Sequence, residues 1–138
     1  MSPGGPTFRL VLVTPEGVRA ERTVESAVMQ AHDGSIGILP SRAPLLCRLD
    51  VGVLRVKVGD EVSRWFVDGG FARMLHDELT VLTSEAVPVG QLDRRTVEAA
   101  LAEARHLPVT DEASRWRRAR AVHRARTMLS LTEPVLTD

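Results

Sequence analysis

The hydrophobic pattern of this 138-residue chain changes near Pro88, and that change constrains its fold more than any other feature. Before Pro88, apolar residues come in short runs or alternate with polar ones, as in Leu54–Val58. Alternation with period two indicates β-strands that bury one face. After Pro88, Val97, Leu101 and Ala104 recur at helical spacing. The sequence therefore predicts a β-domain followed by helices.

Turn signals divide the first part of the chain into short strands. Phe8–Thr14 is a β-favouring run, and Pro15-Glu16-Gly17 after it signals a turn. Gly59-Asp60 suits a two-residue hairpin turn between Leu54–Val58 and Val62–Val67. Strands at this spacing favour a sandwich or flattened barrel.

The next segments continue this pattern. We expect Asp68-Gly69-Gly70 to break a strand and Phe71–Leu75 to resume it. His76-Asp77 then turns the chain into Leu79–Leu82. The expected organisation is a flexible leader over residues 1–7, an all-β sandwich domain over residues 8–88 and a helical hairpin over residues 89–138.

The hairpin is expected to hold two antiparallel helices. Asp93 is placed to cap the first helix, and Thr110 or Asp111 the second. Leu107-Pro108 ends the first helix, because Pro108 disfavours helical geometry at the residue before it. The expected apolar stripe of the second helix is Trp116, Ala119, Val122, Ala125 and Leu129. Alanine-rich faces bury little area, so we expect a loosely held hairpin that can move.

Composition and spacing exclude several classes of function. The formal net charge is zero, which argues against binding to nucleic acid through bulk charge. No apolar run approaches the ~20 residues of a membrane span, so no direct membrane insertion is expected. The four histidines lack metal-site spacing, and no phosphate-binding glycine loop is present. We therefore expect no catalytic residue, metal or cofactor, with Cys47 as a small buried hydrophobe and Trp65 and Trp116 as packing residues.

The segment Asp33–Leu46 combines two glycines, two prolines and aliphatic residues without a nucleophile–base pair. Its glycines allow close approach of the backbone, and Pro40 and Pro44 reduce the entropy lost on docking. A partner-binding loop fits this composition. The alternative is a structural loop that buries Ile38, Leu45 and Leu46 in its own core.

This segment resembles the D-G-x-x-G-I-L-P-x-H-A-P-L-L signature of the epsilon subunit of F-type ATP synthases. Four further segments are similar to that family in the same order: Leu10–Glu16 before this segment, and Gly52–Val56, Val67–Phe71 and Leu79–Leu82 after it. The resemblance spans roughly Thr7 to Leu131. It implies a β-sandwich followed by a helical hairpin.

The resemblance also implies a function. The chain would be a non-catalytic rotor subunit of the central stalk, coupling proton-driven c-ring rotation to ATP synthesis. Its partners would be the gamma subunit, the c-subunit ring and, through the helices, the catalytic beta and alpha subunits, whose ATP hydrolysis the helices can inhibit. It would lie peripherally on the cytoplasmic side of the bacterial cell membrane.

Carried over by position, the c-ring contact would comprise Gly34, Ser35, Ile36, Pro40, Ser41 and Arg42. Arg42 stands where the family usually has histidine, and arginine could pair with a carboxylate on the ring. Arg117, Arg120 and Arg124 share a face of the second helix and would meet an acidic segment of the beta subunit. The alternative for these three is a solvated arginine face.

Some members of the family bind ATP through an [IL]-D-x-x-R-A pattern. Leu92 and Asp93 match its first two positions and are the nucleotide-binding candidates, but Thr96 and Val97 replace the arginine and alanine. ATP binding through this pattern is therefore not expected. Two other functions stay open: a free-standing regulatory or ligand-binding sandwich with a helical gate, and a small hydrolase with an unrecognised site.

Overall fold

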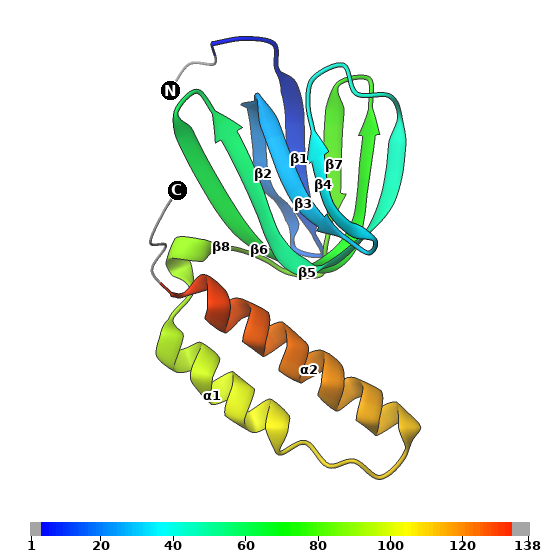
Figure 1. Ribbon diagram of the computed structural model, residues 1–138, viewed down its shortest axis with the longest axis vertical. Coiled ribbons are helices and arrows are strands. Elements are labelled where there is room, and N and C mark those ends of the chain that lie inside the picture. Colours follow the sequence, from blue (N-terminus) through cyan, green and yellow to red (C-terminus); the bar gives the residue numbers. More distant parts are fainter. Residues whose placement is uncertain (1–3, 134–138) are drawn as a thin grey trace. The chain divides into compact units, whose positions relative to one another are not determined.

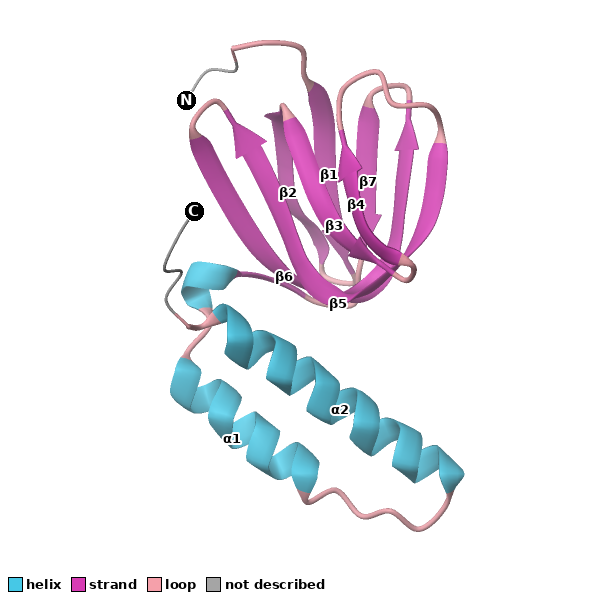
Figure 2. Ribbon diagram, viewed as in Figure 1, coloured by secondary structure: helices cyan, strands magenta, loops and turns pink. Residues whose placement is uncertain are grey.

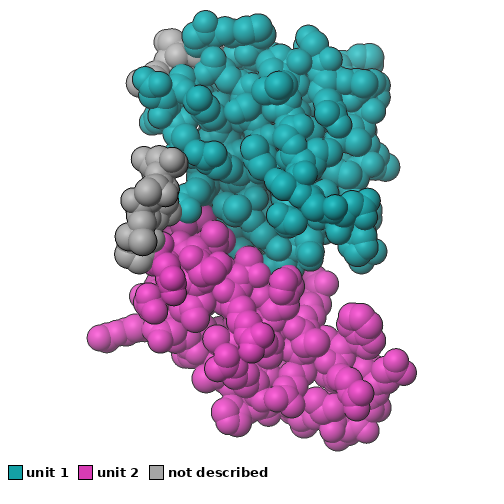
Figure 3. All heavy atoms as spheres, in the orientation of Figure 1, with its two compact units in different colours: residues 1–88 teal, residues 89–138 magenta. Residues whose placement is uncertain are grey.

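The computed structural model describes residues 4–133, which fall into two compact units divided between Pro88 and Val89 (Figure 3). The first unit contains only strands, and the second contains a short 3-10 helix and two α-helices. This is the predicted order of a β-sandwich and two C-terminal helices, and the fold class is confirmed.

Eight strands form the first unit (Figures 1 and 2). They are β1 (Phe8–Thr14), β2 (Gly17–Val24), β3 (Ser26–Ala31), β4 (Gly34–Ile38), β5 (Leu45–Val58), β6 (Glu61–Leu75), β7 (Glu78–Leu82) and β8 (Ala86–Pro88). Their order is β2-β1-β7-β6-β5-β3-β4, and β8 pairs with β6. The β1–β7 pair is parallel, and the other pairs are antiparallel. The long strands β5 and β6 pair with each other in the middle of this order and so connect the strands on either side.

Alternating burial builds the core of this unit. In β1, Phe8, Leu10 and Leu12 are buried and the residues between them are more exposed. In β7, Leu79 and Val81 point into the same core. Burial of such side chains contributes about 25 cal/mol per Å² of apolar area. In β1 and β7 the period-two pattern therefore predicts correctly which face of the strand is buried.

The predicted turns are confirmed. The turn at Gly59-Asp60 joins β5 to β6, and Gly59 has φ of 59°. His76 and Asp77, between β6 and β7, have φ of 50° and 56°. Two successive residues with positive φ give the hairpin turn whose twist matches that of the flanking strands.

The predicted break at Asp68–Gly70 is wrong, because β6 runs through it. Gly69 and Gly70 have φ of 72° and 107°, values that glycine adopts without strain. Before these glycines β6 pairs with β8, and after them it pairs with β7. The glycines therefore bend a continuous strand where it exchanges one neighbour for another.

Three residues of β5 are less buried than predicted. Leu46 is 70% exposed, because alternation along the strand turns it outward. Leu45 and Cys47 are half-buried and pack against the core. Burial raises the pKa of the Cys47 thiol, which keeps it protonated. The interpretation of Leu46 as a core residue is wrong.

The expected leader lies partly outside the described residues, which begin at Gly4. The Gly4 N–H donates to Oε2 of Glu25 over 3.2 Å, and the other carboxylate oxygen of Glu25 accepts the Gly59 N–H. One side chain thus links the start of the described chain to the β5–β6 turn.

The second unit comprises the 3-10 helix η1 (Val89–Gln91), α1 (Arg94–Arg105) and α2 (Glu112–Leu131), with the two α-helices antiparallel (Figure 1). Asp93 caps α1 as predicted, accepting from the Thr96 N–H. Asp111 caps α2 in a reciprocal capping box with Ser114.

The predicted apolar stripe of α2 is confirmed in part: Ala125 is buried and Val122 and Leu129 are half-buried, but the prediction is wrong for Trp116 and Ala119, which are exposed. The buried residues of α2 are Ser114, Ala125 and Met128, whereas Trp116 is 71% exposed. At 3.6 residues per turn, Trp116 lies about 200° around the helix from Ser114. The buried line of α2 faces Val97, Leu101 and Ala104, the buried residues of α1. Three of these six buried residues are serine or alanine.

Candidate functional site

Five of the six predicted c-ring residues divide between the two ends of β4. Gly34 begins the strand with φ of 128°, directly after the turn from β3, and exposed Ser35 follows it. Pro40 and Ser41 lie beyond the other end. At about 3.3 Å per residue, Gly34 and Pro40 are about 20 Å apart. Ile36, between them, packs partly against the core.

The end of this segment is fixed by a turn from another part of the chain. The Ser41 N–H donates to Oδ1 of Asp77 over 2.7 Å. Ser41 has φ of 64°, so its backbone is held in a left-handed conformation. Arg42 follows and is exposed. Pro40–Arg42 is therefore held in place against the β6–β7 turn.

Apolar groups surround this end of the sandwich. Leu39 is 62% exposed, next to Pro40. A shallow cavity of about 280 Å³ lies nearby, lined by Pro44, Leu45, Leu46, Arg73, Met74 and Leu75. Exposed apolar groups that gather in one region mark interaction surfaces in soluble proteins. The geometry suits docking against a partner.

A second apolar surface, which we name the β1–β7 row, crosses three strand pairs on the outside of the sheet. Val13 is paired with Val18 on one side and with Leu82 on the other, and Leu82 is paired with Phe71. Val18, Leu82 and Phe71 are 60%, 50% and 52% exposed. Sequence reasoning missed this row. The sequence feature that could have revealed this row is the apolar side chains at outward-facing strand positions.

Arginines occupy both flanks of the buried line of α2. Arg117, Arg120 and Arg124 lie within about 60° of one another around the helix axis, as predicted from their spacing. Arg115 and Arg118 lie on the other flank. The helix therefore presents two separate basic faces.

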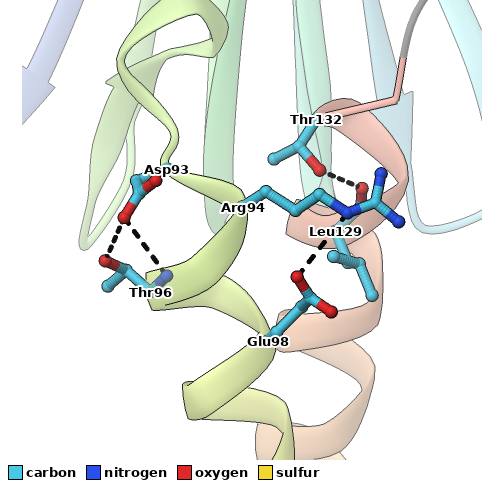
Figure 4. A network of polar contacts seen from close by, with 6 residues as sticks. All are labelled: Asp93, Arg94, Thr96, Glu98, Leu129 and Thr132. Carbon is cyan, nitrogen blue, oxygen red and sulfur yellow. Dashed lines mark hydrogen bonds and ion pairs between the residues drawn. The ribbon is translucent and has the colours of Figure 1, made fainter.

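Leu92 and Asp93 lie at the start of α1. The Asp93 carboxylate accepts from both the backbone N–H and the Oγ1–H of Thr96, and these bonds lower the pKa of Asp93 (Figure 4). Leu92 donates its N–H to the Val89 carbonyl oxygen. Asp93 and Thr96 stand at the aspartate and arginine positions of the [IL]-D-x-x-R-A pattern. In this structure they form the N-terminal cap of α1.

Within residues 4–133, no group of three or more His, Cys, Asp or Glu side chains is arranged to hold a metal ion. Neither α-helix in that range is long and apolar enough to cross a membrane.

Comparison with known proteins agrees with the fold. Residues 7–89 match the family described as "ATP synthase, Delta/Epsilon chain, beta-sandwich domain". The ATP synthase epsilon chain of Rhodopirellula baltica is 38% identical over 123 residues, covering 89% of this chain and 96% of the relative. The chloroplastic epsilon chain of Nicotiana tabacum is 31% identical over 131 residues, covering 94% and 98%.

Two solved structures have a similar fold. A chain in the mitochondrial ATP synthase of Euglena gracilis superposes with a TM-score of 0.82 at 23% identity, covering 94% of this chain and 83% of that one. A chain from the Tetrahymena thermophila central stalk and c-ring gives 0.69 at 16% identity, covering 96% and 100%. Because the relatives match across both units, the chain belongs to the family of ATP synthase epsilon chains.

Proposed function

We propose that this chain is a non-catalytic rotor subunit in the central stalk of an F-type ATP synthase, coupling proton-driven c-ring rotation to ATP synthesis. The observation that carries the proposal is the match to epsilon chains over 89% of the sequence, which includes the sandwich and the hairpin. The two-part build supports it, since a β-sandwich and a helical hairpin can serve different partners.

The sandwich would transmit torque. Strands β5 and β6 pair from Leu45–Met74 at one end to Val58–Glu61 at the other, forming a long ribbon within one continuous sheet. Interiors packed at the density of proteins deform little, so load at one edge is carried to the other. A stiff body of this kind suits a position between ring and shaft.

The two exposed surfaces of the sandwich would serve two partners. The c-ring contact is assigned to Gly34, Ser35, Ile36, Pro40, Ser41 and Arg42. The β1–β7 row is assigned to the gamma subunit, because it is apolar and broad, as the centre of a lasting interface should be. Through these contacts the subunit would lie at the cytoplasmic side of the bacterial membrane.

The hairpin would regulate the complex. Arg117, Arg120 and Arg124 would pair with acidic residues of the catalytic beta and alpha subunits and so inhibit ATP hydrolysis. Exposed ion pairs contribute about 0–1 kcal/mol each, so the three must act together. The alternative role for these three residues is a solvated arginine face.

A co-purification experiment tests the proposal. Tagged full-length chain is mixed with gamma and c-ring, and a Phe71→Ser, Leu82→Ser variant is compared with a Val28→Ser variant, which changes an exposed apolar residue elsewhere on the sandwich. The proposal predicts that gamma is retained by the full-length chain and the Val28→Ser variant and lost from the double variant. A chain that stays monomeric and binds a small metabolite instead would favour a free-standing regulatory module.

A further inference from the structure

Three cations lie together on the outer face of the β5–β6 strand pair. Arg55 of β5 is paired directly with Arg64 of β6, and Lys57 lies two residues further along β5. Leu54 and Val56, the neighbours of Arg55 in the chain, point into the core. Because side chains alternate along a strand, Arg55 and Lys57 point outward, and Arg64 lies opposite Arg55 on the same face. We name these three residues the β5–β6 basic patch.

Within the structure this patch has no neutralising partner. Side chains directly opposite each other in an antiparallel pair have Cβ atoms about 5 Å apart, so the charges of Arg55 and Arg64 repel. In residues 4–133 none of the three cations forms an ion pair. Glu25, whose N–H donates to the Lys57 carbonyl oxygen, uses its carboxylate to accept two backbone N–H groups instead. An anionic partner would remove the repulsion.

The sheet beside the patch is open and partly apolar. Val28 of β3 is the partner of Arg55 across the second strand pair of β5. Beyond Val28 comes Gly37 of β4, where a Cβ atom would meet nothing within 4 Å. Val28 and Val62, the partner of Lys57, are 39% and 42% exposed. The patch therefore combines cations with half-exposed valines on an accessible sheet face.

We propose that the β5–β6 basic patch binds an extended acidic segment of a partner protein. A strand rises about 3.3 Å per residue, so Arg55 and Lys57 are about 7 Å apart along β5. Carboxylates at alternate positions of an extended segment have the same spacing. Such a segment, lying along β5, places one carboxylate between the two arginines and the next beside Lys57. Guanidinium groups donate paired N–H bonds to carboxylates, which makes the arginine contact specific.

The patch suits a peptide better than a membrane surface. Attraction to anionic lipid headgroups needs a cluster of about four to eight basic residues, and this face carries three. The patch also shares no residue with the two surfaces assigned above. On β6, Arg64 precedes the bend at Gly69-Gly70, whereas Phe71 of the β1–β7 row follows it. The occupant is therefore additional to the partners of the proposed function, and its absence would leave that function intact.

NMR titration of the full-length, ¹⁵N-labelled chain tests the proposal. The probe is the end-blocked peptide acetyl-Glu-Thr-Glu-Thr-Glu-amide, and its glutamine counterpart is the neutral control. We expect the amide signals of Val28, Arg55, Lys57 and Arg64 to shift with a dissociation constant below about 1 mM at about 0.15 M ionic strength. R55Q/R64Q should weaken this binding at least about tenfold. The matched control R19Q/R73Q removes two exposed arginines elsewhere on the sandwich and should leave it unchanged.

Arg64→Glu separates loss of binding from loss of folding. A glutamate opposite Arg55 replaces repulsion with attraction, so the urea midpoint should stay the same or rise while peptide binding is lost. Lys57 is the only lysine of the chain, so an activated ester of the acidic peptide should acylate Lys57 in the unchanged chain and much less in R55Q/R64Q. No shift at the four amides, equal loss in R19Q/R73Q, or shifts caused by phosphatidylglycerol vesicles but not by the peptide would overturn the proposal.

Discussion

Gly70 lies so close to Leu82 that a Cβ atom at Gly70 would be 1.9 Å from the Leu82 carbonyl oxygen. The contact is with backbone, which cannot move aside as a flexible side chain can. Gly70 also has φ of 107°, a conformation that other residues rarely adopt. The Gly69-Gly70-Phe71 motif therefore has a physical cause: β6 bends there against β7.

Replacing Gly70 by alanine should destabilise the sandwich. Steric overlap with backbone and a disfavoured φ act together, so we expect the free energy of unfolding to fall by about 3 kcal/mol or more. Urea unfolding of the full-length chain measures it. Gly37→Ala is the control, because a Cβ there meets nothing within 4 Å, and it should change stability by less than about 1 kcal/mol. Equal effects at both positions would contradict this explanation.

The sequence predicted the strands best where one face is buried. The bounds of Phe8–Thr14 are those of β1, because alternation and a following Pro-Glu-Gly turn specify both the strand and its end. The Gly59-Asp60 turn was predicted equally well from the sequence. At Gly69-Gly70 the same reasoning failed, since a glycine pair permits a bend as well as a break, and only pairing with β5 on both sides decides which.

The surface sites were harder to predict. Leu46 and Trp116 are large and apolar, so composition favoured burial, yet both are exposed. Which face of a strand or helix meets the core depends on the partner element, which local sequence does not specify.

Removing the Asp77 carboxylate should loosen the segment after β4. In Asp77→Gly the turn is retained, since glycine accepts the φ of 56°, but the acceptor of the Ser41 N–H is lost. A hydrogen bond to a charged group contributes about 1.5–3 kcal/mol, so the Ser41 amide should exchange at least about tenfold faster.

Hydrogen exchange followed by NMR checks this prediction. His76→Gly changes the neighbouring position of the same turn and leaves the acceptor in place, so exchange at Ser41 should stay as it is in the unchanged chain. Protection that persists in Asp77→Gly would show that other contacts hold the segment.

The helical unit should lose stability in acid. Hydrogen bonds from Thr96 and Ser114 hold the pKa values of Asp93 and Asp111 below the ordinary value of 3.8. A carboxyl whose pKa is lower in the folded state stabilises that state above 3.8, and this contribution is lost as the pH falls through the folded-state pKa. Helical circular dichroism during thermal unfolding, followed down to about pH 2, measures the effect.

The D93N/D111N variant is the matched control for that titration. Asparagine caps a helix without titrating, so the part of the acid dependence that belongs to the caps should vanish. An unchanged slope in the variant would assign the acid sensitivity to other groups.

Loss of Arg117, Arg120 and Arg124 should relieve inhibition of ATP hydrolysis in the assembled complex. At about 0.5 kcal/mol for each exposed pair, the R117A/R120A/R124A variant should populate the inhibited state about tenfold less. Hydrolysis by the complex, with saturating amounts of this chain, is the readout. R115A/R118A/R126A carries the same charge change and should still inhibit. Full inhibition by the R117A/R120A/R124A variant would show that these three arginines do not inhibit hydrolysis.

The most direct test of the stalk assignment is ATP synthesis driven by an imposed proton gradient. Membrane vesicles containing the synthase are stripped of their own epsilon subunit and supplied with this chain or with buffer. The account predicts that the chain binds the vesicles and restores synthesis, because the sandwich then connects ring and shaft. Vesicles that synthesise ATP at the same rate with and without bound chain would contradict it.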